Sequence, residues 1–235
     1  MAPGIQSGPG LSSAGAEARS WRYVAPFAVF TLLLGLAKAA GVGPQVGYPA
    51  RVLAAALVFW WCSRRLVSLK PSRPWASLLV GVAVFLIWVA PDLLWPGYRD
   101  LWLFHNPLTG AARSSAPESL RTDVVFLLFR VAGSALLVPV VEELFWRAWL
   151  MRWLISASFA GLPLGTYAAR AFWLTAVLFA CEHGPYWDVG LAAGVLYNLW
   201  MVRTRSLPDC ILAHAATNAC LAGHVLSAGA WQYWL

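Results

Sequence analysis

The chain has 235 residues, of which 60% are hydrophobic and only 11% are charged. Soluble domains carry about 25% charged residues and need polar cover for their surface, so this composition excludes a soluble protein. The formal net charge is +7, but the basic residues form short clusters between apolar runs rather than a stripe. We therefore expect an integral protein of a lipid bilayer and no nucleic-acid partner.

Long apolar runs fill most of the chain. Residues 1–20 contain none and are rich in Gly, Ser, Ala and Pro, so we expect a disordered tail there. A membrane-spanning helix needs about 20 mostly apolar residues, so residues 21–235 predict a single all-α domain, a polytopic transmembrane helical bundle of about seven spans (range six to eight). The expected spans are residues 23–42, 50–69, 75–95, 131–155, 168–185, 187–203 and 207–227, and residues 119–130 are expected to form an interfacial helix before the fourth.

Arginine and lysine residues predict the orientation. With seven spans, the basic residues near the N-terminus and those of three connections all fall on one side of the membrane. Positively charged loops favour the cytoplasmic side, so we expect a cytoplasmic N-terminus. The small size of the chain suggests a bacterial inner membrane. The basic residues concerned are Arg19, Arg22, Arg64, Arg65, Lys70, Arg73, Arg152, Arg170, Arg203 and Arg205.

Three charged residues interrupt the fourth expected span. Glu142, Glu143 and Arg147 lie within six positions of an otherwise apolar run. Near the centre of a bilayer each charge costs at least ~2.5–3.5 kcal/mol, so such side chains face the bundle interior or a wet cavity. They are therefore the first candidates for a functional site.

Helical geometry separates these three charges. Glu143 and Arg147 are four residues apart, so they share a helix face and can form an ion pair, for which we favour a structural role. Glu142 points about 100° away and has no such partner. A poorly solvated carboxylate of this kind suits a general base. The alternative is that all three charges only hold helices together. Pro139, just upstream, can kink the helix and open room for water.

Two further polar groups follow on later spans. His183 ends the fifth expected span, and His214 and Asn218 lie four residues apart in the seventh. A His beside a carboxylate can help to deprotonate a water, and a His–Asn pair can donate hydrogen bonds to an oxyanion. A single His in an apolar helix is more often a core residue, but three polar groups on successive helices predict a water-using active site. Glu182 and Asp188 are expected at the membrane interface, with a role in the site as the alternative.

The depths of these residues pose a difficulty. Straight helices would place Glu142 near mid-membrane, His183 nearer the outer side and His214 nearer the inner side, roughly 10 Å or more apart at 1.5 Å per residue. Either the fifth helix begins later than expected, or the helices tilt and break around a cavity. The sequence leaves both possibilities open, and the mechanism requires the side chains to converge.

The order of these residues resembles the CPBP family, which comprises CAAX-prenyl endopeptidases and bacteriocin-processing or self-immunity membrane proteins. The resemblance covers about residues 123–220, and the first three spans are generic. Ala148 departs from the family pattern, which often has Gly after the Arg. The matching motifs are Glu142-Glu143-x-x-x-Arg147, Phe179-x-x-x-His183, Gly194 with Arg203-x-x-Ser206-Leu207, and His214-x-x-x-Asn218.

The resemblance implies an intramembrane endopeptidase that cleaves a peptide bond of a membrane-associated or lipidated protein. In such an enzyme Glu142, assisted by His183, would activate a water. His214 and Asn218 would form the oxyanion site, and the neighbouring ion pair would support the arrangement. We favour a mechanism without a metal cofactor. A zinc-dependent variant stays open because the first carboxylate and the two His residues could supply three ligands, although the chain has no H-E-x-x-H helix.

Two other functions compete with the enzyme. The chain could be a non-catalytic membrane scaffold or a bacteriocin-immunity-type protein that keeps the motifs for structure. It could also be a proton-coupled transporter that uses the buried carboxylates. A transporter predicts inverted repeats with broken helices in both halves, and we find none in the sequence.

Overall fold

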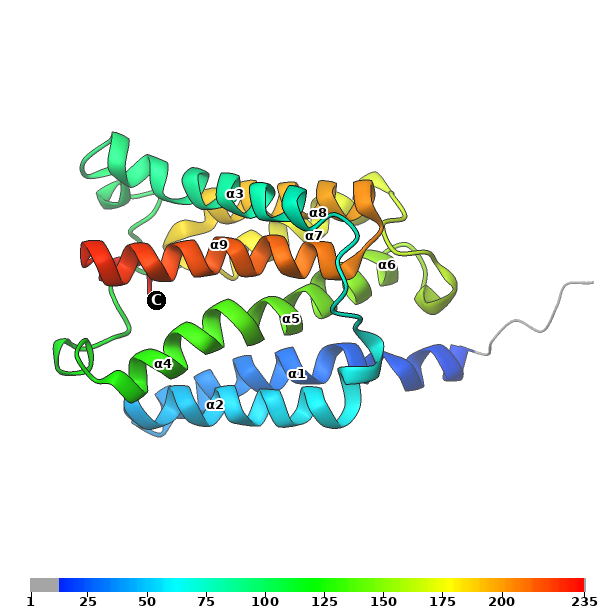
Figure 1. Ribbon diagram of the computed structural model, residues 1–235, viewed down its shortest axis with the longest axis horizontal. Helices are drawn as coiled ribbons and strands as arrows, with labels where there is room; N and C mark the ends of the chain where they lie inside the picture. The colour runs from blue at the N-terminus through cyan, green and yellow to red at the C-terminus, as the bar shows by residue number, and fades with distance from the viewer. Residues whose placement is uncertain (1–12, 235) are drawn as a thin grey trace, which may run out of the picture.

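The computed structural model of the protein describes residues 13–234. Most of the tail predicted over residues 1–20 lies outside these described residues, and the first helix already begins at Ser13. Within the described residues, seven long helices run back and forth along one axis, which confirms the predicted helical membrane bundle (Figure 1). They are α1 (Ser13–Ala39), α2 (Pro44–Val58, continued to Leu66), α3 (Pro74–Leu94), the central helix α4–α6 (Val124–Trp153), α7 (Ala169–Cys181), α8 (Trp187–Thr204) and α9 (Leu207–Ala228).

The central helix divides the bundle (Figure 1). Helices α1 and α2 pack along one side of it, whereas α9 and α7 pack on the other side and are themselves covered by α3 and α8. The connections at residues 67–73, 154–168 and 205–206 lie at the same end of the bundle as the beginning of α1. The basic connections therefore share one end, and which side of the membrane that end faces stays a prediction.

The central helix begins earlier than the expected span over residues 131–155. The Asp123 carboxylate accepts a hydrogen bond from the Phe126 backbone N–H at 3.0 Å, an N-cap that fixes the helix start at Val124. The interfacial helix expected over residues 119–130 is therefore wrong, because most of that segment forms the first turns of the central helix itself. Residues 95–123 form the long connection before it.

Five of the described helices are long and apolar enough to cross a membrane: α1, α2, α3, the central helix and α9. Helices α7 and α8 are not among them, and α7 has only 13 residues. A helix of that length spans about 20 Å, less than the ~30 Å hydrocarbon core of a bilayer. Helix α7 is therefore too short to cross a bilayer by itself, and the chain turns at residues 182–186 into α8. Irregular backbone inside a membrane is tolerated only where protein or a wet cavity covers it.

A buried carboxylate anchors α9 to the beginning of α3. Asp209 is fully buried and accepts hydrogen bonds from the backbone N–H groups of Ser72 (2.9 Å) and Arg73 (2.8 Å) and from the Ser77 hydroxyl (2.9 Å). The first N–H groups of a helix have no partner within the helix, so a carboxylate at this place satisfies them. This contact sets where α9 lies along α3.

Small residues let the backbones of α3 and α9 approach each other closely. A Cβ atom added to Gly81 would overlap the Ala213 carbonyl and the Ala216 methyl group. The Thr217 hydroxyl donates a hydrogen bond to the Gly81 carbonyl at 2.8 Å. Contacts of this kind replace the hydrophobic effect as the source of helix association in lipid.

We expect Gly81→Ala to lower the free energy of unfolding by about 1–3 kcal/mol, because the added methyl group forces the two helices apart. The matched control is Gly223→Ala in α9, where an added Cβ meets nothing within 4 Å. That variant should be neutral or slightly stabilised, since Ala favours a helix by about 1 kcal/mol over Gly. Thermal unfolding of both proteins in detergent micelles provides the comparison, and equal stability of the two would refute the close packing.

Candidate active site

Two widened turns flank the predicted charge cluster in the central helix. Residues Gly133–Leu137 and Leu144–Leu150 form π-helical turns on either side of the short α-helical segment Val138–Glu143. Such turns are rare and often occur at functional sites. They shift the helical phase next to the two carboxylates.

The first π turn exposes a backbone acceptor. The Val138 N–H donates to the Gly133 carbonyl, which takes the usual α-helical donor away from the Ser134 carbonyl. The next N–H along the helix would belong to Pro139, which has none. The Asn218 side-chain amide fills this position and donates to the Ser134 carbonyl at 2.8 Å. Asn218 therefore fixes α9 against the central helix and still has a second N–H, since a side-chain amide carries two.

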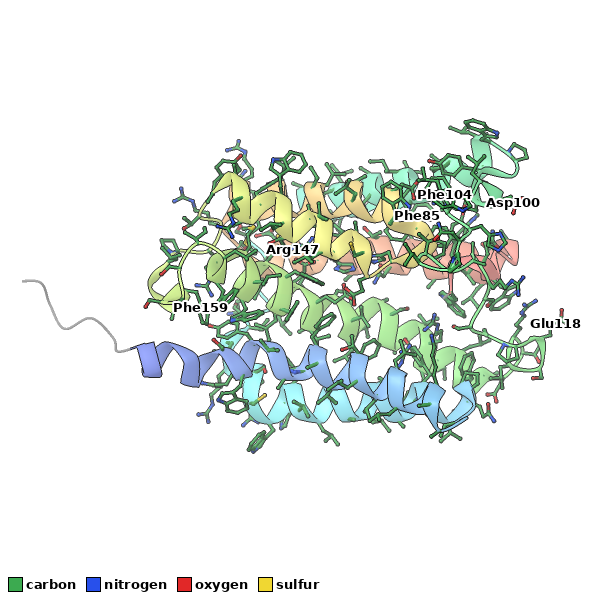
Figure 2. All side chains as sticks on the ribbon, turned by 180° about the vertical axis from the view of Figure 1, so that it is seen from behind. Phe85, Asp100, Phe104, Glu118, Arg147 and Phe159 are labelled. Carbon is green, nitrogen blue, oxygen red and sulfur yellow. The ribbon has the colours of Figure 1, made fainter. Side chains whose placement is uncertain are left out.

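A buried charge cluster joins the central helix to α8 and α9. One oxygen of Glu143, Oε1, lies 2.9 Å from Arg147 Nη1 and 2.9 Å from His214 Nδ1. Arg147 Nε also donates to Asn198 Oδ1 at 3.1 Å. Both members of the ion pair have 0% exposed side chains, and Figure 2 shows Arg147 inside the bundle, between its two ends. The charge of Glu143 is thus committed to two partners.

Aromatic rings hold the cluster in place. The Arg147 guanidinium lies 4.5 Å from the centre of the Phe179 ring and 5.3 Å from that of Tyr197. The Tyr197 ring stacks on His214 with ring centres 5.0 Å apart, and the Tyr197 hydroxyl donates to the Thr217 hydroxyl at 2.7 Å. Cation–π contacts gain strength where water is excluded. These rings hold the His214 side chain in place beside Glu143.

Glu142 has a different environment from its neighbour. Its side chain is buried (7% exposed), and its Oε2 atom has no hydrogen-bond partner among the residues that the structure describes. It lines a cavity of about 380 Å³ together with His183, His214 and Asn218. The four side chains that the sequence proposed as catalytic therefore border one space, although their roles stay predictions.

His183 reaches this cavity because α7 ends early, at Cys181, and not at residue 185 as expected. Its Nδ1 atom lies 2.7 Å from the Phe179 carbonyl, so Nδ1 carries the proton and Nε2 is the free acceptor. The Phe179 ring lies 4.6 Å from the His183 ring and 6.1 Å from the His214 ring, centre to centre. Of the two possibilities that the sequence left open, the break in the helix is the one that brings these groups together.

A second ion cluster fixes the turn that carries His183. Arg99 binds Asp188 at 2.5 Å and Asp92 at 2.9 Å, and it donates to the Pro185 carbonyl at 2.8 Å. Tyr98 donates its hydroxyl to Asp188 at 3.0 Å. Burial, followed by the nearby Asp188 charge, raises the pKa of the Tyr98 hydroxyl, so it stays a donor. Asp188, for which the interface was the favoured expectation, ties the beginning of α8 to the connection after α3.

Sequence reasoning missed several residues of the cavity. Glu182, expected at the membrane interface, lines the cavity with Glu142. Trp88 lines it too, and its indole N–H is buried without a hydrogen-bond partner in the described part of the chain. The place of Glu182 could have been inferred from Gly184 and Pro185, since helices usually end before the residue that precedes a proline. Nothing in the local sequence marks Trp88.

Possible metal ligands were considered in the same region. Within residues 13–234, no three His, Cys, Asp or Glu side chains are grouped so that they could hold a metal ion. The alternative zinc ligand set of Glu142, His183 and His214 is therefore not among such groups, metal dependence stays a prediction, and the chemistry proposed below uses no step through a metal.

Comparison with protein families found a match in the second part of the chain. Residues 124–220 match the family model described as type II CAAX prenyl endopeptidase, Rce1-like. This segment, called the CPBP segment below, is therefore similar to the CPBP family of CAAX proteases. The CPBP segment begins with the central helix and ends in α9, so it contains every residue that the sequence proposed for the site. Searches of curated proteins and of solved structures found no match. The chain is thus an integral membrane protein in which residues 124–220 are similar to a family of proteases.

We expect Arg147→Met to destabilise the protein by about 3–5 kcal/mol, because it leaves the buried Glu143 carboxylate without its cation. The control is Arg64→Met on α2, where the exposed guanidinium donates to the Trp60 carbonyl and lies over the Trp60 ring, and the change should stay within about 0.5 kcal/mol. Adding Glu143→Gln to the Arg147→Met protein should recover part of the loss. Thermal unfolding in detergent measures all three, and a melting temperature of Arg147→Met equal to that of the control would contradict the cluster.

Proposed function

We propose that the protein is an intramembrane endopeptidase that hydrolyses a peptide bond of a membrane-associated or lipidated protein. The observation that carries the proposal is the state of Glu142, a buried carboxylate that borders a cavity with two His and one Asn while its Oε2 atom has no partner among the described residues. The description of the matching family as prenyl endopeptidases supports the same reaction.

Glu142 acts as the general base. Glu142 lines the cavity and Glu143 does not, and Arg147 and His214 bind the Oε1 atom of Glu143, so Glu142 is the carboxylate that can accept a hydrogen bond from a water in the cavity. It removes a proton as the water oxygen attacks the carbonyl carbon of the scissile bond. His183 assists, since its Nδ1 proton is directed at the Phe179 carbonyl and its Nε2 atom can accept the second hydrogen of the same water.

His214 and Asn218 stabilise the oxyanion that forms on the carbonyl oxygen. Asn218 offers the amide N–H that is not used by the Ser134 carbonyl. His214 directs its Nδ1 proton at Glu143, so it donates from Nε2 only as an imidazolium, and the carboxylate of Glu143 stabilises that charge. Fixed donors of this kind lower the barrier because they need no rearrangement as charge develops.

The tetrahedral intermediate then breaks its bond between carbon and nitrogen. The proton that Glu142 took from the water passes to the leaving nitrogen, which departs as an amine. The water oxygen stays in the new carboxyl end, which becomes a carboxylate when it releases the second water proton to solvent, and Glu142 returns to its ionised form. One water is consumed for each bond cleaved, and no cofactor takes part.

We expect Glu142→Gln to lower the rate of cleavage by at least about 10²–10⁴, because an amide cannot accept the proton of the water. The control is Glu118→Gln, whose side chain is 91% exposed in the connection before the central helix and should leave cleavage unchanged. Cells whose own copy is replaced by each variant are compared by proteomics for membrane or secreted proteins that keep an uncut segment.

The same comparison decides between the competing functions. Processing that continues in Glu142→Gln cells would favour a scaffold or immunity protein over an enzyme. Once a substrate is identified in this way, cleavage by the purified protein is repeated after exhaustive chelation. We expect it to continue, whereas a loss that zinc restores would contradict the metal-free mechanism.

A further inference from the structure

The tip of the long connection after α3, residues 101–110, is apolar although it lies outside the helices. It contains no Asp, Glu, Lys or Arg. Its large apolar side chains are exposed: 44% for Leu101, 77% for Trp102, 50% for Leu103 and 97% for Leu108. Exposed apolar surface gathered in one place marks a site where a membrane or another protein binds. The proposed cleavage reaction does not use these side chains.

The end of α3 directs the tip outward. Gly97 takes a left-handed conformation (φ 81°), which Gly adopts without strain, and turns the chain after the helix. Figure 1 shows the connection bending to the side of α3 that is opposite α9. Helix α3 is long and apolar enough to cross a membrane, and its last residues Leu93 and Leu94 are 64% and 82% exposed. The tip therefore continues the lipid-facing surface of α3.

The backbone of the tip finds many of its hydrogen-bond partners within the tip itself. The Asn106 side-chain amide donates to the Trp102 carbonyl at 2.8 Å. Its Oδ1 atom accepts from the backbone N–H groups of Leu108 at 2.9 Å and Thr109 at 3.1 Å. The backbones of Asn106 and Gly110 exchange two further hydrogen bonds. Polar groups that leave water need such partners, so these bonds lower the cost of moving the tip into a less polar medium.

We propose that residues 101–110 form a membrane-anchoring surface that binds the phospholipid interface of the bilayer that α3 crosses. Trp is enriched at the level of the lipid headgroups, and Leu side chains enter the boundary between headgroups and acyl chains. Trp95, 60% exposed at the end of α3, adds an exposed indole to that of Trp102. The inference goes beyond the proposed function and does not depend on Glu142.

The size and charge of the surface favour lipid over a protein partner. A stable protein interface buries about 800 Å² and 20–30 residues on each side. The tip exposes only the four large apolar side chains named above. It also offers no charged group that could select a protein partner, whereas binding at a lipid interface needs only apolar surface to bury.

The same connection holds the turn that carries His183. The Trp187 indole N–H donates to the Leu103 carbonyl at 3.2 Å. Arg99, two residues before the tip, donates to the Pro185 carbonyl at 2.8 Å. The segment proposed to meet lipid is therefore also the one that fixes the turn of the candidate active site.

A photoreactive probe tests what the tip contacts. Full-length Leu108→p-benzoylphenylalanine protein is reconstituted in nanodiscs of phosphatidylcholine and irradiated, and the mass of the chain is measured. We expect an adduct of one phosphatidylcholine, in a yield comparable with that of the positive control Leu86→p-benzoylphenylalanine on the exposed side of α3. The same probe at Trp102 repeats the measurement, so the test does not depend on the folding of one variant.

The negative control carries the same probe at Glu118. This side chain is 91% exposed and lies in the same connection, and Figure 2 shows Glu118, Asp100 and Phe104 at one end of the bundle. We expect at least about tenfold less lipid adduct at Glu118, because an exposed charged position faces water and not the lipid interface. Both positions carry the same benzophenone, so an attraction of the probe itself to lipid would appear in the control.

Two results would overturn the surface. The first is a lipid yield at Leu108 and Trp102 no higher than that at Glu118. The second is protein as the occupant: in cell membranes, where partners are present, these probes would crosslink to a second copy of the chain or to another protein in place of lipid. Neither measurement involves cleavage. Failure of the surface therefore leaves the proposed function standing, and processing that ignores Glu142 refutes the protease without affecting the surface.

Discussion

The rest of the site depends on one oxygen atom, Oε1 of Glu143, which binds Arg147 and His214 at the same distance of 2.9 Å. All three residues are buried, so none of these charges could be placed there alone without a large free-energy cost. Together they join the central helix to α9, and through Asn198 they also join it to α8. The consequence reaches the neighbouring residue, since Glu142 is left as the carboxylate that can bind a ligand or a water.

The second constraint is the backbone, which must satisfy its own polar groups inside a membrane. The π turn before Pro139 leaves the Ser134 carbonyl without a helical donor, and Asn218 supplies one from α9. The early end of α7 is followed by irregular backbone, and Arg99 binds that turn through the Pro185 carbonyl. Both departures from regular helix open space beside Glu142, and in both a polar side chain from elsewhere compensates the backbone.

Much of the fold and part of the site could be predicted from the sequence. Apolar runs predicted the helical bundle, and the spacing of Glu143 and Arg147 predicted an ion pair because neighbours four residues apart share a helix face. The partner of His214 could not be predicted, since it depends on how α9 lies against the central helix. The end of α7 was predicted too late although Gly184 and Pro185 mark it, because a continuous apolar run outweighed the local signal.

Two arginines that line the cavity, Arg51 and Arg130, show another limit of sequence reasoning. Arg51 and Arg130 lie on helices that are distant along the chain, and each by itself resembles a basic residue near the end of a membrane span. Only the packing of both around Tyr48 reveals that they face one cavity. Pairing across generic spans carries no local pattern, so a single sequence could not indicate it.

The central claim is a division of roles between two adjacent carboxylates, in which Glu143 supports the structure and Glu142 stays free. The most direct test is the midpoint of thermal unfolding of Glu142→Gln beside that of Glu143→Gln, measured on purified protein in the same detergent. The account predicts an unchanged or raised midpoint for Glu142→Gln, because it removes a buried charge without a protein partner, and a clearly lowered midpoint for Glu143→Gln. A lowered midpoint for Glu142→Gln with an unchanged one for Glu143→Gln would contradict it.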